Sequence, residues 1–547
     1  MHTKIKSLKQ TNMSWILAVI FISIPTFFRM IRTGIYSMQD FPYFRLVEYG
    51  KCLSDWQIPC RWSPDAGLGF GEPLFNFYGQ ASYFVGGLIH LLGFSYVNSL
   101  KILFAFTILG SGITMFFLAK RIWKDNWAAL VSSIVYMYAP YRAVDVWVRG
   151  ALPEAMSFVI IPLVIFHIDT FIETRKRKNL LWFSIFLSLL IVNHNLSLLI
   201  FAPFLVLWTL YRLVQSNKSV DGGQKLGIAI LISLLLSSFY LLPVLFESQY
   251  INLSSTIQGY FDFRAHFVTI PQLLISRFWG YGGSTWGNED GLSLSIGQLQ
   301  WILPLIAFCF LLFNRKFSEL KRVTVLLFIG WFGLFMTHNK SAFLWEMVPQ
   351  MAYIQFPWRF LMLSLFSFSL ASGAVVLQLK KYKQVIAILI IVLSIAFNFS
   401  FFKEDIWYSY HDSDLTTGQK WIEQTRASIG DYWPIYGPIL KEPASSLLGT
   451  DNAILHTTNK VLYTFEVSRD TPITYSINYF PGWKAFIDTK EVPITSSDGG
   501  FITVMVPKGT HNILIAFKNT PLRLLGNVIS IITVFLVGVF LLEYEKQ

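Results

Sequence analysis

The chain has 547 residues, of which 54% are hydrophobic, 17% aromatic and only 14% charged. That composition excludes an ordinary water-soluble globular protein and indicates a lipid bilayer as the solvent. The formal net charge of +12 comes from short basic stretches between apolar runs, and no soluble basic domain with interleaved aromatic residues is present. We therefore expect no nucleic-acid partner.

About twelve apolar runs are long enough to be membrane spans, because a helix rising 1.5 Å per residue crosses ~30 Å of hydrocarbon in about 20 residues. The predicted spans cover residues 14–31, 100–119, 126–141, 152–171, 179–193, 195–213, 225–243, 297–313, 322–337, 358–378, 384–402 and 521–542. The first run has a basic flank but no small-residue cleavage site, so we interpret it as a retained anchor. The sequence predicts a polytopic α-helical membrane protein.

The orientation of the chain follows from its lysines and arginines, which collect in alternate short loops. Short cytoplasmic loops carry the excess of positive charge in membrane proteins. This rule predicts a multi-pass plasma-membrane protein with cytoplasmic N- and C-termini. Four long segments then face outward, at residues 32–99, 245–296, 338–357 and 403–520. Sites are usually built on long structured loops, so we expect function on this extracytoplasmic face.

Three regions divide the sequence. Residues 1–402 are predicted to form a multi-span membrane domain, with residues 32–99 as its first outward loop, in which the short apolar run 82–94 is an interfacial or re-entrant helix. Residues 403–520 carry Thr, Ile and Val alternation between PGW, DGG and PKG turns, which predicts an extracytoplasmic β-sandwich. Residues 521–547 are predicted to be a final span and a short cytoplasmic tail.

The first outward loop holds the acids that are best placed for chemistry. Asp40 follows the first predicted span closely and can act as a base near the membrane surface. The same loop contains further residues that could line a site: Arg45, Glu48 and Asp65. These acids could also hold a divalent cation, or be ordinary solvated loop acids. Cys52 and Cys60 are in the same loop, and the sequence is compatible with a disulfide between them or with two free thiols.

Charged residues also lie at the ends of later spans, where ionisable groups are costly unless they are used or paired. Asp145, Arg149 and Glu154 fall in one short outward turn. Arg149 can bind a phosphate bidentately, or pair internally with an acid. Further candidates on the same face are two more phosphate-binding arginines, Arg277 and Arg359, and three residues that could line a site, His194, Trp279 and Tyr281.

Several segments resemble known membrane families. RWSPDAGLGFGEPLFNFYG, APYRAVDVWVRGALPEA, FWGYGGST and QFPWRF resemble the bacterial and archaeal family labelled 6-pyruvoyl-tetrahydropterin-synthase-related. YFPGWKAFIDTKEVPI and GGFITVMVPKGTHNILIAFK are similar to the tail of YfhO-like membrane proteins. The soluble pterin synthase uses a zinc-bound histidine cluster that this sequence does not supply, so we do not expect pterin chemistry.

The resemblance implies the GT-C glycosyltransferase superfamily, whose members combine many spans with an essential acid in the first outward loop and use a polyprenyl-phosphate sugar donor. Asp40 occupies the place of that acid, although its neighbours Gln39 and Phe41 do not supply the paired acid that the superfamily often shows. In an inverting transfer, Asp40 would take the proton of the acceptor while polyprenyl phosphate leaves, stabilised by arginine.

Two functions fit this sequence. The first is a hexosyltransferase-like membrane enzyme that uses a polyprenyl-phosphate sugar, among membrane lipids, to modify an extracytoplasmic glycan, cell-wall polymer, lipid or protein. The second is a non-catalytic transporter or binding protein for lipid-linked cell-envelope polymer precursors. The two differ over Asp40, because transfer requires a base and transport does not.

Overall fold

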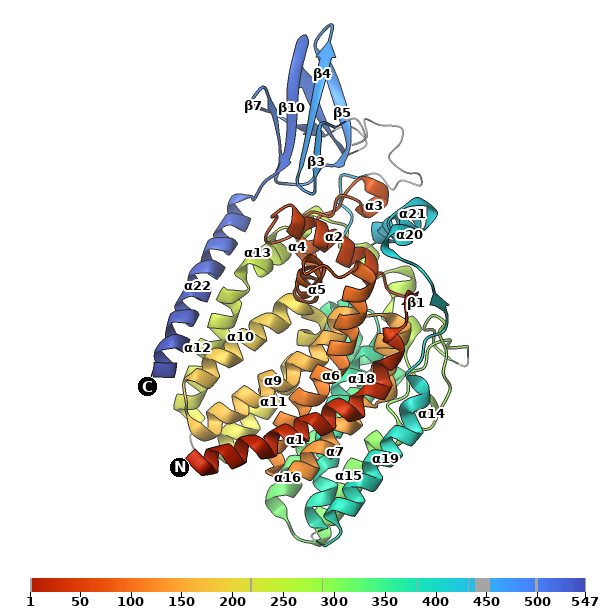
Figure 1. The fold of residues 1–547 in the computed structure, drawn as a ribbon, viewed down its shortest axis with the longest axis vertical. Coiled ribbons are helices and arrows are strands. Elements are labelled where there is room, and N and C mark those ends of the chain that lie inside the picture. The colour runs from red at the N-terminus through yellow and green to blue at the C-terminus, as the bar shows by residue number, and fades with distance from the viewer. Residues whose placement is uncertain are drawn as a thin grey trace. The chain divides into compact units, whose positions relative to one another are not determined.

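A computed structural model describes residues 2–216, 219–287, 289–379, 381–430, 432–437, 453–496 and 500–546 (Figure 1). The chain divides into two compact units. The first unit comprises residues 1–40, 101–233 and 257–409, and the second unit comprises residues 41–100, 234–256 and 410–547. The first outward loop predicted from the sequence therefore groups mainly with the C-terminal residues.

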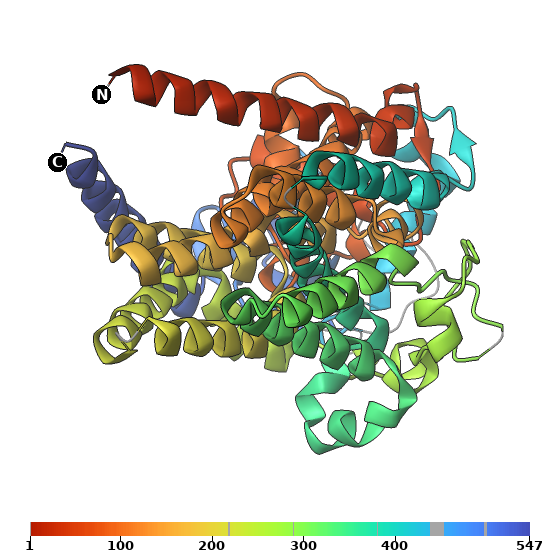
Figure 2. The same ribbon diagram turned by 90° about the horizontal axis from the view of Figure 1, so that it is seen from below.

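The first unit is helical. Its principal helices are α1 (His2–Phe27), α6 (Tyr96–Trp123), α7 (Asn126–Met137), α8 (Pro140–Ala143), α9 (Leu152–Thr174), α10 (Lys178–Asn193), α11 (Asn195–Gln215), α12 (Ser219–Leu236), α14 (Ile270–Leu274), α15 (Gln298–Phe313), α16 (Phe317–Thr337), α17 (Ala342–Met347), α18 (Leu361–Ser372) and α19 (Lys383–Asn398). The apolar helix α18 packs against α7, α15 and α16, and α1 lies along the edge of this bundle (Figure 2). The centre of the unit is thus built on a helix with no charged residue.

Eight helices of the described chain are long and apolar enough to cross a membrane. They cover Asn12–Ile31, Tyr96–Trp123, Leu152–Thr174, Asn195–Gln215, Phe317–Thr337, Pro357–Leu377, Lys383–Phe401 and Pro521–Glu543. The pair α12 and α13 (Ser238–Phe246) is a ninth if it counts as one broken span. Three further predicted spans are shorter helices, α7, α10 and α15, and fall below the ~20 residues that a crossing needs. The count of twelve is therefore not confirmed.

The first unit also contains a small ladder that ties its N-terminal part to residues far along the chain. Strand β1 (Ile35–Tyr36) pairs antiparallel with β2 (Trp407–Tyr408). Gly34 makes this approach possible, because it has a φ of +87° and a Cβ there would lie 2.0 Å from the carbonyl oxygen of Tyr408. The chain that leaves the first span is thereby held in place just before Asp40.

The second unit combines short helices with two antiparallel sheets. The helices are α2 (Pro42–Ser54), α3 (Ala66–Gly69), α4 (Leu74–Phe77), α5 (Ala81–Leu91), α13, α20 (Asp412–Leu415), α21 (Gly418–Ala427) and α22 (Pro521–Lys546). The strands are β3 (Leu455–Thr457), β4 (Lys460–Val467), β5 (Thr471–Asn478), β6 (Trp483–Ile487), β7 (Lys490–Val492), β8 (Thr495–Ser496), β9 (Phe501–Val506) and β10 (Gly509–Phe517). Their orders are β3-β4-β10-β6-β7 and β5-β9-β8.

Both sheets contribute to one hydrophobic core. Ile513 and Ile515 of β10 and Val504 and Val506 of β9 are fully buried in it, as the alternation of apolar residues in β-strands requires. Trp62 from the first outward loop packs in the same core. The C-terminal sheet region predicted from the sequence is therefore present. Among the described residues its first strand begins at Leu455, whereas the predicted domain boundary is residue 403.

Candidate functional site

Asp40 lies on a segment that runs beside the turn Val144–Arg149 in the first unit. The Tyr36 hydroxyl donates to the carbonyl of Val146 at 3.1 Å. The backbone N–H groups of Gln39 and Asp40 donate to the carbonyls of Val148 and Arg149, at 3.0 and 2.8 Å. These bonds fix the backbone of Asp40 at the C-terminal end of the turn, while its side chain is partly exposed.

The turn itself is set by its sequence, APYRAVDVWVRGALPEA. Pro140 opens α8 at a first-turn position, where its missing N–H costs nothing. The wide π-helical turn Val144–Arg149 follows and ends at Gly150, whose φ is +67°. A Cβ at Gly150 would lie 2.7 Å from Sδ of Met38, so the close approach of the Asp40 segment requires glycine. Glu154 then enters in the first turn of α9.

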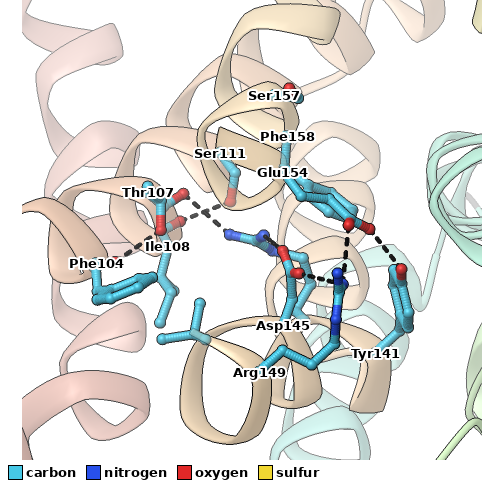
Figure 3. Close-up of polar contacts among 12 residues, drawn as sticks. Phe104, Thr107, Ile108, Ser111, Tyr141, Asp145, Arg149, Glu154, Ser157 and Phe158 are labelled. Carbon is cyan, nitrogen blue, oxygen red and sulfur yellow. Dashed lines mark hydrogen bonds and ion pairs between the residues drawn. The ribbon is translucent and has the colours of Figure 1, made fainter. Parts of the chain in front are cut away.

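The charged side chains of this turn form a buried cluster (Figure 3). Nη1 of Arg149 lies 2.8 Å from Oδ1 of Asp145 and 2.8 Å from Oε2 of Glu154. The Tyr141 hydroxyl donates to Oε1 of Glu154 at 2.5 Å, and Nη1 of Arg142 lies 3.8 Å from Oδ2 of Asp145. Of the two interpretations left open for Arg149, internal pairing is therefore present in this structure.

Arg359 and Trp358 reach this cluster from the turn Pro357–Phe360, far along the sequence. Nε of Arg359 lies 3.7 Å from Oε2 of Glu154, and the guanidinium of Arg149 stands 4.5 Å from the centre of the Trp358 ring, a cation–π distance. Trp358 is held in turn by a 3.0 Å hydrogen bond from its Nε1 to the Ser284 hydroxyl. The cluster thus joins three separate parts of the first unit.

His194 completes the surroundings of the cluster. Burial lowers the pKa of His194 to about 3, against an opposing effect of Glu154 and with the help of Arg359 and Arg149. Asp40 is a further charge that acts on this imidazole. His194 is therefore a neutral residue whose Nδ1 is 2.6 Å from the Ser197 hydroxyl. The electrostatic effects of Asp40, Glu154, Arg149 and Arg359 on His194 place these four residues around the same imidazole.

The structure does not bring Arg277 into this cluster. Its guanidinium contacts the carbonyl of Phe397 and stands 5.2 Å from the centre of the Phe401 ring. Trp279 stacks on the same Phe401 ring, with ring centres 5.0 Å apart. Arg277 and Trp279 thus share an aromatic surface that is separate from Arg149 and Arg359.

Tyr281 has a different relation to the site. Its hydroxyl donates to the carbonyls of Lys403 and Glu404, at 3.2 and 3.0 Å. Its own carbonyl accepts a 2.9 Å hydrogen bond from Nε2 of Gln39, and Gly282 accepts a second at 2.7 Å. The backbone of the Tyr281 loop therefore holds Gln39, the residue before Asp40, whereas the Tyr281 hydroxyl is bonded to the chain at Lys403 and Glu404.

The remaining candidates, Arg45, Glu48 and Asp65, belong to the second unit. Nζ of Lys51 lies 3.0 Å from Oε1 of Glu48 and also pairs with Asp65. Burial raises the pKa of Glu48, even though the Ser63 hydroxyl donates to Oε2 at 2.6 Å. These acids thus form a group around Lys51, and their participation in a site with Asp40 stays a prediction.

Arg45 and the cysteines complete this part of the second unit. The Arg45 guanidinium stands 4.3 Å from the centre of the Tyr78 ring. Cys52 and Cys60 form a disulfide with a Cα–Cα distance of 5.6 Å. Within the described ranges, no group of three or more His, Cys, Asp or Glu side chains is arranged to hold a metal ion. The divalent cation stays a prediction.

Sequence reasoning did not single out Tyr141. Its ring is fully buried and its hydroxyl is bonded to Glu154, but an aromatic residue in an apolar turn carries no local signal of a polar partner. The only indication was its position in a turn already rich in charge, where each buried carboxylate needs hydrogen-bond donors.

Parts of this chain are similar to two known proteins, one in sequence and one in structure. An uncharacterized protein from Lactococcus lactis subsp. cremoris (strain MG1363) is 22% identical over 252 residues, which are 44% of this chain and 41% of that protein. The chain thus spans less than half the length of this relative. Arabinofuranosyltransferase AftD from mycobacteria is similar in structure with a TM-score of 0.42 and 12% identity, over 71% of this chain and 26% of AftD. That likeness is too weak to assign a fold or an activity.

The family model of the bacterial membrane protein YfhO matches residues 58–421 and 445–530. These ranges contain most of the chain, from the first outward loop into the final helix. They support the YfhO part of the resemblance seen in the sequence, whereas the pterin-synthase-related label has no such support. Together with the apolar helices, the match indicates a multi-pass membrane protein. The chain belongs to the YfhO family of bacterial membrane proteins.

Proposed function

We propose that this protein is a membrane glycosyltransferase that moves a sugar from a polyprenyl-phosphate carrier to an extracytoplasmic glycan, cell-wall polymer, lipid or protein. The observation that carries the proposal is the 2.8 Å hydrogen bond from the backbone of Asp40 to that of Arg149. It joins a partly exposed acid in the first predicted outward loop to a buried cluster of arginines. A sugar-phosphate site needs both kinds of group.

In the proposed reaction, the Asp40 carboxylate takes the proton of an acceptor hydroxyl. The acceptor oxygen forms a bond to C1 of the sugar, and the bond from C1 to the phosphate oxygen breaks. The electron pair of that bond leaves with polyprenyl phosphate. An arginine guanidinium stabilises the phosphate with charge-assisted hydrogen bonds. Arg359 is a candidate for this role, because its guanidinium lies at the cluster, with Nε 3.7 Å from Oε2 of Glu154.

The charges of the neighbourhood support this assignment. Three arginines, Arg142, Arg149 and Arg359, face two buried acids, Asp145 and Glu154. Asp40 acts electrostatically on His194 in the same neighbourhood. A proton taken by Asp40 therefore makes this neighbourhood more positive as negative charge develops on the leaving phosphate. Electrostatic stabilisation that is already in place at that moment is a large source of catalysis.

A second function, handling of lipid-linked polymer precursors without catalysis, is favoured by one observation. Arg149 already pairs with Asp145 and Glu154 at 2.8 Å, so its charge is satisfied without a ligand. In that case the cluster stabilises the turn, and Asp40 contacts a carrier lipid without taking a proton.

The test uses the purified full chain in detergent with radiolabelled polyprenyl-phosphate sugars and a membrane acceptor. Asp40→Asn should lower the turnover by about 10²–10⁴-fold, the usual contribution of a general base. Asp405→Asn, which changes an exposed acid of the first unit, should leave the turnover unchanged. Equal turnover of Asp40→Asn and wild type would refute the base assignment. Donor binding without any transfer by the wild type would favour the second function.

A further inference from the structure

A cavity of about 220 Å³ lies in the first unit, away from the Asp40 site. It is lined by the C-terminal ends of α6, α9 and α11 and by the beginning of α16, through residues that include Arg121, Lys124, Glu173, Trp208, Arg212 and Arg322. Glu154 begins α9 at the candidate site and Glu173 ends it at the cavity. At 1.5 Å per residue the two are about 28 Å apart, so the cavity lies at the opposite, predicted cytoplasmic, end of the helices.

Positive charge dominates the cavity wall. Four cations, Arg121, Lys124, Arg212 and Arg322, face Glu173 on the wall and Asp169 behind it. Asp169 is shared by two arginines, at 3.0 Å from Nε of Arg121 and 2.6 Å from Nε of Arg212. Glu173 is shared as well, at 2.7 Å from Arg121 and 3.6 Å from Lys124. Two acids therefore do not neutralise the four cations.

The helix ends explain part of this excess. Cations near a helix C-terminus are favourable, and arginine can satisfy the last carbonyls. Nη1 of Arg322 donates to the carbonyl of Ile122 at 3.0 Å, and Nη2 of Arg121 donates to that of Asp169 at 3.2 Å. Each of these bonds occupies one N–H of a guanidinium that has five. The helix ends thus orient the arginines and leave donors for a ligand.

Trp208 provides an independent observation. Its side chain is only 1% exposed and lines the cavity. Its indole N–H is buried with no hydrogen-bond acceptor among the residues that the structure describes. A buried donor without a partner is unfavourable, because it has lost its hydrogen bonds to water and gained none in the protein. An acceptor oxygen inside the cavity would remove that cost.

The size of the cavity limits the kind of ligand that it can bind. Sites for drug-sized molecules measure about 300–1,000 Å³, so 220 Å³ suits a group as small as phosphate. Phosphate supplies acceptor oxygens for the indole N–H and the arginines, together with negative charge for the unbalanced cations. We infer that this cavity binds a phosphate group, either in the headgroup of an anionic membrane lipid or as free phosphate. Basic pockets between spans commonly take such headgroups.

The experiment measures ligand binding to the full chain in detergent by native mass spectrometry. The probes are dihexanoyl phosphatidylglycerol, zwitterionic dihexanoyl phosphatidylcholine and inorganic phosphate. The double variant Lys124→Gln, Arg322→Gln should weaken binding of the phosphatidylglycerol at least about 10-fold, since a hydrogen bond to a charged group contributes about 1.5–3 kcal/mol. Lys321→Gln is the matched control, because it removes a cation from the neighbouring exposed position, and it should bind as the wild type does.

A second variant keeps the inference testable if the double variant does not fold. Trp208→Phe removes the indole N–H and retains an aromatic ring, and we expect it to weaken binding about 3-fold, as the loss of one hydrogen bond does. Binding of phosphatidylglycerol but not phosphatidylcholine identifies a lipid headgroup as the source, and binding of inorganic phosphate alone identifies the free anion. Equal binding by wild type and double variant, or no binding of any probe, overturns the inference. None of these outcomes depends on Asp40 or on sugar transfer.

Discussion

The backbone N–H of Asp40 donates a 2.8 Å hydrogen bond to the backbone carbonyl of Arg149. The link between the two residues thus runs through main-chain atoms, which a substitution of the Asp40 side chain leaves in place. A variant such as Asp40→Asn therefore removes the carboxylate without releasing the segment that holds it. Loss of activity in that variant reports on chemistry, because the position of residue 40 is set by the turn Val144–Arg149 and the neighbouring bond from Gln39.

Truncation of Arg149 should destabilise the protein strongly. Arg149→Met leaves Asp145 and Glu154 buried without their shared partner, and breaking a buried ion pair from one side costs about 3–5 kcal/mol. The free energy of unfolding, measured by denaturant titration in detergent, checks this. Arg277→Met, at an exposed arginine, should change it by less than about 0.5 kcal/mol. Equal effects of the two substitutions would contradict the cluster.

Tyr141→Phe should have a smaller effect. The hydroxyl of Tyr141 donates to ionised Glu154, and a hydrogen bond to a charged group is worth about 1.5–3 kcal/mol. Tyr136→Phe is the matched control, since it removes a bond from a buried tyrosine to the neutral carbonyl of Phe158, worth about 0.5–1.5 kcal/mol. Thermal unfolding of both variants in one detergent compares them. The reverse order of Tm values would show that Glu154 does not need this donor.

The stability of the first unit should depend on the protonation of Asp290. Burial raises the pKa of Asp290 from 3.8 to about 6, against hydrogen bonds from Leu292, Thr285 and Gln272. The folded state then binds more protons than the unfolded state between these values, so the contribution of this group to stability falls as pH rises from about 4 to about 6. Above pH 6 its contribution is constant.

Asp290→Asn tests this dependence because the amide does not titrate. The Tm of the wild type minus that of the variant should decrease between pH 4 and 6 and then level off. A difference that stays constant from pH 4 to 8 would contradict the raised pKa. Since the same loop holds Gln39 through Tyr281 and Gly282, donor binding is a second quantity to follow across this pH range.

The disulfide between Cys52 and Cys60 should stabilise the second unit. The two cysteines are 8 residues apart, and closing such a short loop contributes about 2–3 kcal/mol through the entropy of the unfolded chain. The double variant Cys52→Ser, Cys60→Ser should lower the Tm, and a reductant should lower that of the wild type equally. Cys309→Ser, at an exposed free cysteine, should change neither value. A Tm insensitive to reductant would refute the bond.

The sequence predicted the helical segments well, because long apolar runs have few alternatives in a bilayer. Every predicted span overlaps a helix, but α7, α10 and α15 are shorter than a crossing requires. Apolar composition does not distinguish a helix that faces lipid from one buried by its neighbours. For this reason the prediction of twelve membrane spans is not confirmed.

The candidate site was predicted only where its residues are close in sequence. Asp145, Arg149 and Glu154 lie within ten residues of one another, so their short spacing in the sequence predicts that they are close in the structure. Arg359 joins Glu154 from more than 200 residues away, and Arg277 was assigned the same role yet packs on Phe401. Both are arginines near the end of a predicted span, and a single sequence holds no signal that separates their long-range contacts.

The ladder between β1 and β2 has a consequence for how the protein is made. Ile35 pairs with Tyr408, and Tyr36 pairs with Trp407. The chain just before Asp40 therefore cannot form this ladder until residues much later in the sequence have been synthesised. At about 5–20 residues per second, the ribosome needs roughly 20–75 s to reach them. The Asp40 segment is therefore among the first parts of the first unit to be translated and among the last to acquire its final position.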